Sequence, residues 1–190
     1  MQIKKAMILA AGFGRRMLPL TETIPKPLIK IGPKNLLERS IELLIKIGVK
    51  EIVLNIYYLS DEIEKFIKSK NYSIQISLIK EEKLLDTGGG IFNATKKFND
   101  DPFFVLNPDT IWNKNYYEEL KVLENLYFTR ERPVLLLVDK KKSYDKSFKG
   151  DFSFINNQLI TREKKNNFIF TGAQIINRSI FNEVDKNVFS

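Results

Sequence analysis

A short stretch near the N-terminus combines an apolar run, a glycine turn and several cations. Residues 9–28 read LAAGFGRRMLPLTETIPKPL, and the run at 6–11 before the glycines is typical of a buried strand. Glycines let a backbone come close to a ligand, because no Cβ stands in the way. Arg16 and Lys26 follow the glycines, and such cations neutralise phosphate oxygens. The pattern therefore predicts a site for the phosphates of a nucleotide.

Two well-known phosphate-binding motifs do not fit this stretch. A Rossmann fingerprint needs glycine at its sixth position, where this chain has Met17. A Walker A loop needs the pattern G-x-x-x-x-G-K-[ST], which the sequence lacks. Gly12 and Gly14 alone are weak evidence, because such pairs are common in ordinary turns. The whole stretch through Pro27 is far more specific.

The composition limits the chemistry. The 190 residues contain no cysteine and no histidine, so disulfides, thiolate sites and histidine bases are excluded. Catalysis must use carboxylates, lysine, arginine, backbone N–H groups or a hard metal. The net charge of +8 comes from lysines scattered among acidic residues. We therefore expect a solvated basic surface that steers anionic substrates, and no nucleic-acid partner.

Strands and helices are expected to alternate along the chain, which predicts βαβ units and a mostly parallel sheet. The expected strands are 6–11, 51–56, 74–79, 103–107, 134–138, 151–155, 158–162 and 168–176. Five helices are expected: 35–47, 60–68, a helix that starts within the glycines at 88–90 and ends at 98, 116–127, and 178–184. Asn35 is the expected N-cap of the first helix and Gly48 its stop, and Ser60 is the expected N-cap of the second. A lysine-rich loop is expected at 139–149, and Asn156-Asn157 as a hairpin turn.

Ligands of such sheets bind beyond the carboxyl ends of the strands. Gly12, the pair Thr87-Gly88 and Asp109 all follow expected strands, so we expect them to gather at one edge. The N-terminus leads straight into the glycine turn, and no segment approaches the roughly 18 apolar residues of a membrane span. We expect one soluble, cytoplasmic domain spanning residues 1–190, with no membrane partner.

The pattern LAAGxGxRMxPLTxxxPKPL resembles the signature of the sugar-1-phosphate nucleotidylyltransferases. Four later segments agree in order and spacing: LLDTGGGIF (84–92), VLNPDTIW (105–112), KGDF (149–152) and FTG (170–172). The DTGGGIF, GDF and FTG segments are most similar to the N-acetylmuramate-1-phosphate uridylyltransferase branch. The resemblance implies a Rossmann-like, three-layer α/β/α fold with a mostly parallel mixed sheet, of the nucleotide-diphospho-sugar transferase type.

The reaction that the resemblance implies is attack by a sugar-1-phosphate oxygen on the α-phosphorus of an NTP, which expels pyrophosphate. The attacking phosphate is already an anion, so no general base is needed. Arg16 would bind the triphosphate and stabilise the leaving pyrophosphate. Lys26, between two prolines, would lie between the α-phosphate and the sugar phosphate. Asp109 would hold Mg²⁺, which prefers oxygen ligands.

The resemblance also implies two groups of binding residues. Those for the nucleotide are Leu9, Ala10, Ala11, Gly12, Gly14, Asp86, Thr87 and Gly88. Those for the sugar are Gly150, Glu163, Thr171 and Gly172. Relatives carry a second acidic metal ligand near a W-x-D-V-G-T-like segment, which this sequence lacks, and Asp185 is a poor substitute. We expect a chain without the family's C-terminal segment, either truncated or working with an incomplete metal site.

The resemblance favours UTP and N-acetylmuramate 1-phosphate as substrates, with the oligomeric state open. Within the same class, the alternative is a mannose- or glucose-1-phosphate nucleotidylyltransferase with another base. An alternative of a different class is a non-catalytic nucleotide-sugar binding or regulatory domain. A basic nucleic-acid binder is a further alternative, which leaves Arg16, Lys26 and Asp109 unexplained.

Overall fold

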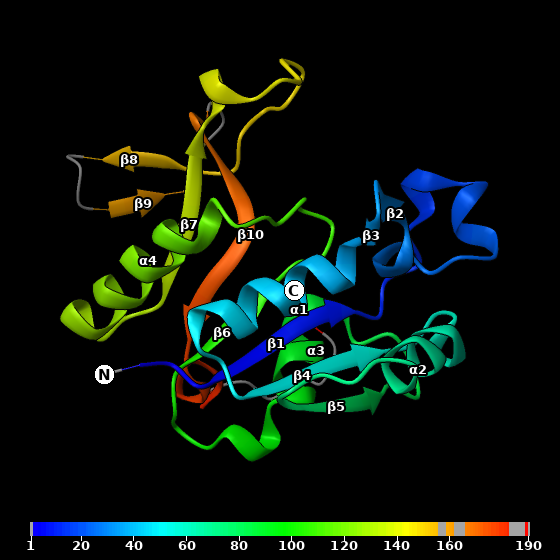
Figure 1. Ribbon diagram of the computed structural model, residues 1–190. Helices are drawn as coiled ribbons and strands as arrows, with labels where there is room; N and C mark the ends of the chain where they lie inside the picture. Colours follow the sequence, from blue (N-terminus) through cyan, green and yellow to red (C-terminus); the bar gives the residue numbers. More distant parts are fainter. Residues whose placement is uncertain (1, 156–158, 162–165, 183–188, 190) are drawn as a thin grey trace.

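The computed structural model describes residues 2–155, 159–161, 166–182 and 189 of the chain, and a six-stranded sheet forms its centre (Figure 1). The strand order is β5-β4-β1-β6-β10-β7. These strands are β1 (Lys5–Ala10), β4 (Glu51–Ile56), β5 (Gln75–Lys80), β6 (Phe103–Leu106), β7 (Val134–Asp139) and β10 (Phe168–Ile176). The first four are parallel, and β10 is antiparallel to β6 and β7. The expected mostly parallel mixed sheet is confirmed.

Helices cover both faces of the sheet. Apolar residues of α1 (Leu36–Ile47), α2 (Ser60–Lys68) and α4 (Tyr116–Arg130) pack with Ala6 and Ile8 of β1 in one core cluster. The opposite face carries α3 (Asp86–Ala94), which packs with Met7 in a second cluster. Neighbouring residues of a strand point to opposite faces, so β1 contributes to both cores. The result is the three-layer α/β/α arrangement expected from the sequence.

The remaining elements are short. They are the 3-10 turns η1 (Arg15–Met17), η2 (Leu20–Glu22), η3 (Lys26–Leu28), η4 (Lys96–Phe98), η5 (Lys140–Lys142) and η6 (Arg178–Phe181), and the strands β2 (Lys30–Ile31), β3 (Lys34–Asn35), β8 (Ser153–Ile155) and β9 (Leu159–Thr161). Among the described residues, none of the helices has the length and apolar character to cross a membrane.

Helix α1 begins and ends as its sequence predicts. The Asn35 side chain accepts a hydrogen bond from the Glu38 N–H at 2.7 Å, which satisfies a donor that the helix leaves free. At the other end Gly48 adopts a left-handed conformation, with φ at 99°. Leu37 and Ile41 are fully buried on the face that meets the sheet.

The expected cap of α2 is wrong. The N-cap position is Leu59, which has φ at 48° and makes no side-chain cap bond. Because the chain turns at Leu59, Ser60 already lies within the helix, where its hydroxyl is 3.3 Å from an Asp61 carboxylate oxygen. Ser60 therefore cannot serve as the flanking residue that the sequence suggested.

Toward the C-terminus the structure differs from the expectation in detail. The loop at 139–149 contains η5, where the Asp139 side chain accepts from the Lys141 N–H at 2.8 Å. Strands β8 and β9 pair antiparallel, as a hairpin requires, while its expected turn at 156–157 lies outside the described residues. The expected helix 178–184 begins as the 3-10 turn η6, and residues 183–188 lie outside the described part.

Candidate active site

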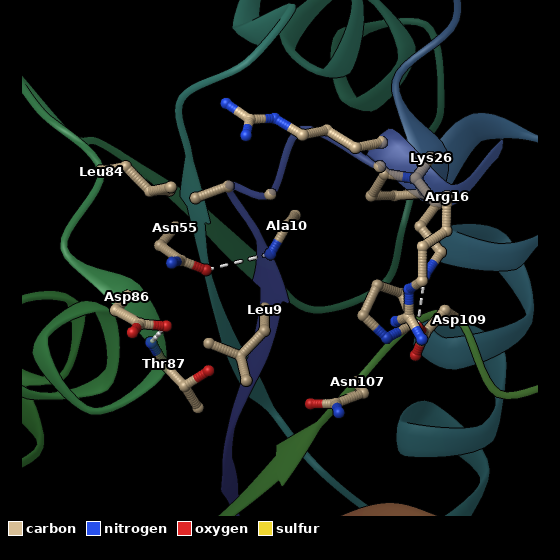
Figure 2. Close-up of a pocket in the computed structure, with 16 residues that line it drawn as sticks. Leu9, Ala10, Arg16, Lys26, Asn55, Leu84, Asp86, Thr87, Asn107 and Asp109 are labelled. Carbon is tan, nitrogen blue, oxygen red and sulfur yellow. Dashed lines mark hydrogen bonds and ion pairs between the residues drawn. The ribbon is translucent and has the colours of Figure 1, made fainter. Parts of the chain in front are cut away.

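A cavity of about 380 Å³ lies beyond the carboxyl ends of β1, β4 and β6 (Figure 2). Its size falls in the range of small-molecule sites. The predicted site residues that line it are Leu9, Ala10, Ala11, Gly12, Gly14, Arg16, Lys26, Asp86, Thr87 and Asp109. Six more lining residues are Arg15, Pro27, Asn55, Leu84, Asn107 and Pro108. The expected convergence of Gly12, Thr87 and Asp109 at one sheet edge is therefore confirmed.

The two glycines of the N-terminal turn have different surroundings. Gly14 has φ at 66°, and a Cβ there would come within 2.9 Å of the Thr21 side chain and 3.1 Å of Lys26. The buried Thr21 hydroxyl donates to the Gly14 carbonyl at 3.0 Å, which ties the turn to η2. A Cβ on Gly12 would have no atom within 4 Å. Gly14 is needed by the fold, whereas Gly12 leaves room at the cavity wall.

Lys26 and Asp109 form an ion pair on one side of the cavity, with 2.5 Å between Lys26 Nζ and Asp109 Oδ2. Lys26 opens η3 after Pro25, which has φ at −62°, and the following Pro27 is buried. The two prolines therefore restrict the backbone on both sides of this lysine. The pair brings the expected phosphate ligand and the expected metal ligand together.

Three hydrogen bonds hold the loop that carries Asp109, one within the loop and two to β10. The Trp112 indole N–H donates to the Asn107 carbonyl at 2.8 Å. The Asn107 N–H donates to the Gly172 carbonyl at 2.8 Å, and the Thr110 hydroxyl to the Thr171 carbonyl at 2.6 Å. Trp112 is completely buried, so its bond acts from within the core. Together these bonds fix the position of the carboxylate loop against β10.

The opposite side of the cavity carries Leu84, Asp86 and Thr87 (Figure 2). Asp86 has φ at 61°, an uncommon conformation that aspartate adopts more readily than most residues. Its carboxylate accepts from the Thr87 N–H at 2.8 Å. Both side chains are exposed at the cavity edge, which leaves them accessible to a ligand.

Gly88 does not line the cavity. A Cβ on Gly88 would lie 2.5 Å from the Phe189 ring, and the Gly89 N–H donates to the Phe189 carbonyl at 2.9 Å. The close approach to the backbone at Gly88 and Gly89 is therefore made by the chain itself. The predicted contact of Gly88 with a nucleotide stays a prediction.

The predicted sugar residues lie outside the cavity lining or outside the described chain. Gly150 has φ at 77°, and a Cβ there would meet the Asn166 carbonyl oxygen at 2.5 Å. A Cβ on Gly172 would meet Asn107 at 2.7 Å, and the Thr171 hydroxyl donates to the Leu136 carbonyl. These three residues therefore have folding roles of their own. Glu163 and Asp185 lie outside the described residues.

Two buried polar residues near the cavity were not predicted from the sequence. Asn55 is 2% exposed and Glu81 is 3% exposed, and they hydrogen bond to each other at 2.8 Å. The available signal was the single polar residue in the apolar strand EIVLNI. A polar side chain inside a buried strand needs a partner, which marks it for attention.

The charges of the cavity lining suit an anionic ligand that binds together with a metal ion. Arg15, Arg16 and Lys26 supply cations, and Asp109 offers a hard oxygen ligand of the kind Mg²⁺ prefers. In the part of the chain that the structure describes, no three or more carboxylate, histidine or cysteine side chains cluster to hold a metal. The donor set fits an ion whose other ligands are phosphates and water.

Comparison with known proteins identifies the family. The model of the nucleotidyl transferase family matches residues 5–143. The chain belongs to this family. Its likeness to the sugar-1-phosphate nucleotidylyltransferases is confirmed by relatives with curated functions.

Two of these relatives and one solved structure illustrate the likeness of this nucleotidyl transferase chain. The mannose-1-phosphate guanylyltransferase catalytic subunit beta of Xenopus tropicalis is 40% identical over 121 residues, 62% of this chain and 34% of that protein. The N-acetylmuramate alpha-1-phosphate uridylyltransferase of Caulobacter vibrioides is 38% identical over 114 residues, 57% of this chain and 47% of that protein. The crystal structure of HddC from Yersinia pseudotuberculosis complexed with GMP-PN is 26% identical, with a TM-score of 0.79, over 99% of this chain and 83% of that chain.

The nucleotidyl transferase chain spans about a third of the first relative and about half of the second. Its fold is that of the nucleotide-diphospho-sugar transferases, as the sequence predicted.

Proposed function

We propose that this chain joins an NTP and a sugar 1-phosphate to give a nucleoside-diphosphate sugar and pyrophosphate. The observation that carries the proposal is the arrangement around the cavity. Arg16 and the Lys26–Asp109 pair belong to its lining, and Asp86 and Thr87 lie across from that pair (Figure 2). If the triphosphate binds on the side of Arg16 and Lys26, the nucleoside lies on the side of Asp86 and Thr87.

The reaction forms one bond and breaks one. A phosphate oxygen of the sugar 1-phosphate attacks the α-phosphorus, and the bond to the β-phosphate breaks as pyrophosphate leaves. Arg16 neutralises the leaving pyrophosphate, and Lys26 holds the α-phosphate and the sugar phosphate close to each other. The attacking oxygen carries no proton to remove, which suits a chain without histidine.

Asp109 is the proposed ligand for Mg²⁺. When bound there with the triphosphate, the ion supplies positive charge to phosphate oxygens in the transition state. Asp109 would hold the ion, and Lys26, whose Nζ lies 2.5 Å from Asp109 Oδ2, would contact the phosphates beside it. The ion pair therefore holds both residues at the proposed place of reaction.

We propose UTP and N-acetylmuramate 1-phosphate as the substrates. The support is the likeness of the DTGGGIF, GDF and FTG segments to the uridylyltransferase branch, together with the Caulobacter relative. Asp86 and Thr87 would meet the base, and Gly150, Glu163, Thr171 and Gly172 the sugar. The guanylyltransferase relative supports a second candidate, GTP with mannose 1-phosphate.

Pyrophosphate release separates these candidates. The chain is mixed with Mg²⁺, one of UTP, CTP, GTP or dTTP, and one of N-acetylmuramate, mannose or glucose 1-phosphate. Turnover only with UTP and N-acetylmuramate 1-phosphate supports the first candidate, and turnover with GTP and mannose 1-phosphate the second. Nucleotide binding by calorimetry without any turnover would instead identify a binding or regulatory domain.

A further inference from the structure

Glu81 is a buried carboxylate that the proposed reaction does not use. It is 3% exposed, and it has no ion pair with any residue in the described part of the chain. Neutral donors bind it instead: Asn55 Nδ2 donates to Oε1 at 2.8 Å, and the Leu85 N–H donates to Oε2 at 3.0 Å. Burying a carboxylate costs several kcal/mol unless hydrogen bonds offset the loss of water. A carboxylate buried behind the lining residue Asn55 points to a geometric role.

The hydrogen bonds of Glu81 connect the end of β1 to the 84–87 segment. The Ala10 N–H at the end of β1 donates to Asn55 Oδ1 at 3.0 Å (Figure 2). Asn55 then donates to Glu81, which holds the N–H of Leu85. Ala10 lines one part of the cavity, and Leu84 and Asp86, on either side of Leu85, line another. The chain of three bonds therefore sets the position of the 84–87 segment relative to β1.

Helix α3 packs against the Asn55–Glu81 pair at Gly90. A Cβ on Gly90 would lie 2.6 Å from Asn55 Nδ2 and 3.0 Å from Glu81 Oε1. The backbone of Glu81 is itself fixed, because its N–H donates to the Ile56 carbonyl at 2.9 Å. The start of α3, which includes Asp86 and Thr87, thus rests on an immobilised polar pair.

We propose that Glu81, acting through Asn55 and the Leu85 N–H, is a positioning residue that holds the 84–87 segment in the conformation that receives the nucleoside. The inference rests on the proposed function, since it assigns the segment to the nucleotide. It predicts an effect on nucleotide binding and none on the sugar phosphate, because Lys26 and Asp109 lie on the opposite side of the cavity.

The hydrogen-bond pattern allows a test by exchange of amide and carboxylate. In Glu81→Gln, the new amide N–H₂ faces another donor, either Asn55 Nδ2 or the Leu85 N–H. If the Asn55 amide flips to accept from the new N–H₂, its own N–H₂ then faces the Ala10 N–H, so one pair of donors still faces each other. Asn55→Asp puts two carboxylates in contact. The double variant Asn55→Asp/Glu81→Gln restores every bond: the new carboxylate accepts from Ala10 and from the new amide, whose oxygen accepts from Leu85.

Glu124→Gln is the control at a second buried carboxylate, which unlike Glu81 has an ion-pair partner, with 2.8 Å between Lys121 Nζ and Glu124 Oε2. Glu124 is also 3% exposed and accepts a backbone N–H, that of Ile3, at 2.6 Å, but it lies in α4 and outside the cavity lining. Both Glu81→Gln and Glu124→Gln remove a buried carboxylate, so both are expected to lower the melting temperature. Only the substitution beside the cavity is expected to change nucleotide binding.

The measurements are the Kd for UTP with Mg²⁺ by calorimetry and the steady-state KM for each substrate, with the other three NTPs as further probes. Each single variant is expected to weaken nucleotide binding about tenfold, with kcat and the sugar-phosphate KM within about twofold of wild type. The double variant is expected to recover wild-type affinity. Unchanged nucleotide affinity in the single variants, or a double variant as weak as their sum, would overturn the inference.

Two further outcomes, a single variant that does not fold and a wild type that binds no NTP, also have defined consequences for the inference. If a single variant does not fold, the double variant, which keeps every hydrogen bond, still has to bind nucleotide as wild type does, and weak binding by the folded double variant overturns the inference. If wild type binds none of the four NTPs, the proposed function fails and the inference falls with it. Normal binding by wild type with no response to the substitutions sinks the inference alone.

Discussion

Lys26 Nζ lies 2.5 Å from Asp109 Oδ2, although 83 positions separate the two residues in the sequence. The ion pair joins a 3-10 turn that follows β1 to the loop that follows β6. These strands are neighbours in the sheet, so their carboxyl ends place both loops at one edge. The two residues with the most direct proposed roles are thus in direct contact.

Removal of the Asp109 carboxylate is expected to slow turnover strongly while leaving metal-independent nucleotide binding intact. Asp109→Ala should lower kcat with Mg²⁺ by about 10²–10³-fold, the usual effect of losing one electrostatic ligand of a transition state. Asp101→Ala is the control, because it removes the partner of another lysine, Lys5, in an ion pair outside the cavity lining. Turnover by Asp109→Ala at the wild-type rate would contradict the assignment.

The two cations are expected to differ in kinetic effect. Arg16→Ala should raise the KM for the NTP and lower kcat, because Arg16 is proposed to bind the triphosphate and the leaving pyrophosphate. Lys26→Ala should lower kcat by about 10²-fold or more with a smaller change in NTP affinity. The exposed Lys30→Ala, in β2, serves as the control for the loss of one positive charge. Equal responses of all three variants would point to general electrostatic steering.

The glycine pair of the N-terminal turn offers a test in which stability and binding separate. Gly14→Ala should destabilise the fold by about 1–2 kcal/mol, since alanine is strained at φ 66° and its Cβ would meet Thr21. Gly12→Ala should leave the melting temperature nearly unchanged, because open space surrounds that position, and should weaken nucleotide binding at the cavity wall. Denaturant titration and calorimetry check the two effects, and a reversed pattern would disprove this reading of the turn.

Tyr72 is expected to make folding stability fall at alkaline pH. Burial, with added repulsion from Glu38 and Glu42, raises the pKa of its hydroxyl from 10.0 to about 12. The folded chain then holds this proton more tightly than the unfolded chain. The contribution of this protonated hydroxyl to the free energy of unfolding is complete below pH 10 and is lost as the pH rises to about 12. The free energy of unfolding is expected to fall by about 1–2 kcal/mol over this range, after allowance for solvent around the ring.

Tyr72→Phe tests this dependence by urea denaturation between pH 8 and pH 12. The Tyr72 hydroxyl is buried and has no hydrogen-bond partner among the described residues, so the substitution should be neutral or stabilising by about 1 kcal/mol at pH 8. Its advantage over wild type should grow above pH 10. Tyr144→Phe, at a fully exposed position, is the control for loss of a phenol. A constant difference between Tyr72→Phe and wild type across the pH range would refute the expectation.

Local sequence patterns predicted much of the fold because they reflect interactions between residues that are close in the sequence. Apolar alternation and the Asn35 cap depend on residues close in sequence, and these predictions were confirmed. The cap at Ser60 was wrong for a related reason. Its chemistry suits a cap, but the backbone turn falls one residue earlier, at Leu59. A boundary of this kind depends on how the preceding loop is packed.

The sequence by itself determined the family and the order of strands and helices. Only the tertiary structure decided which side chains meet: Lys26 with Asp109, Asn55 with Glu81, and Gly88 with Phe189. The physical reason is that such contacts depend on strand order and on how α3 packs against the sheet. Residue types and spacing along the chain do not specify either one.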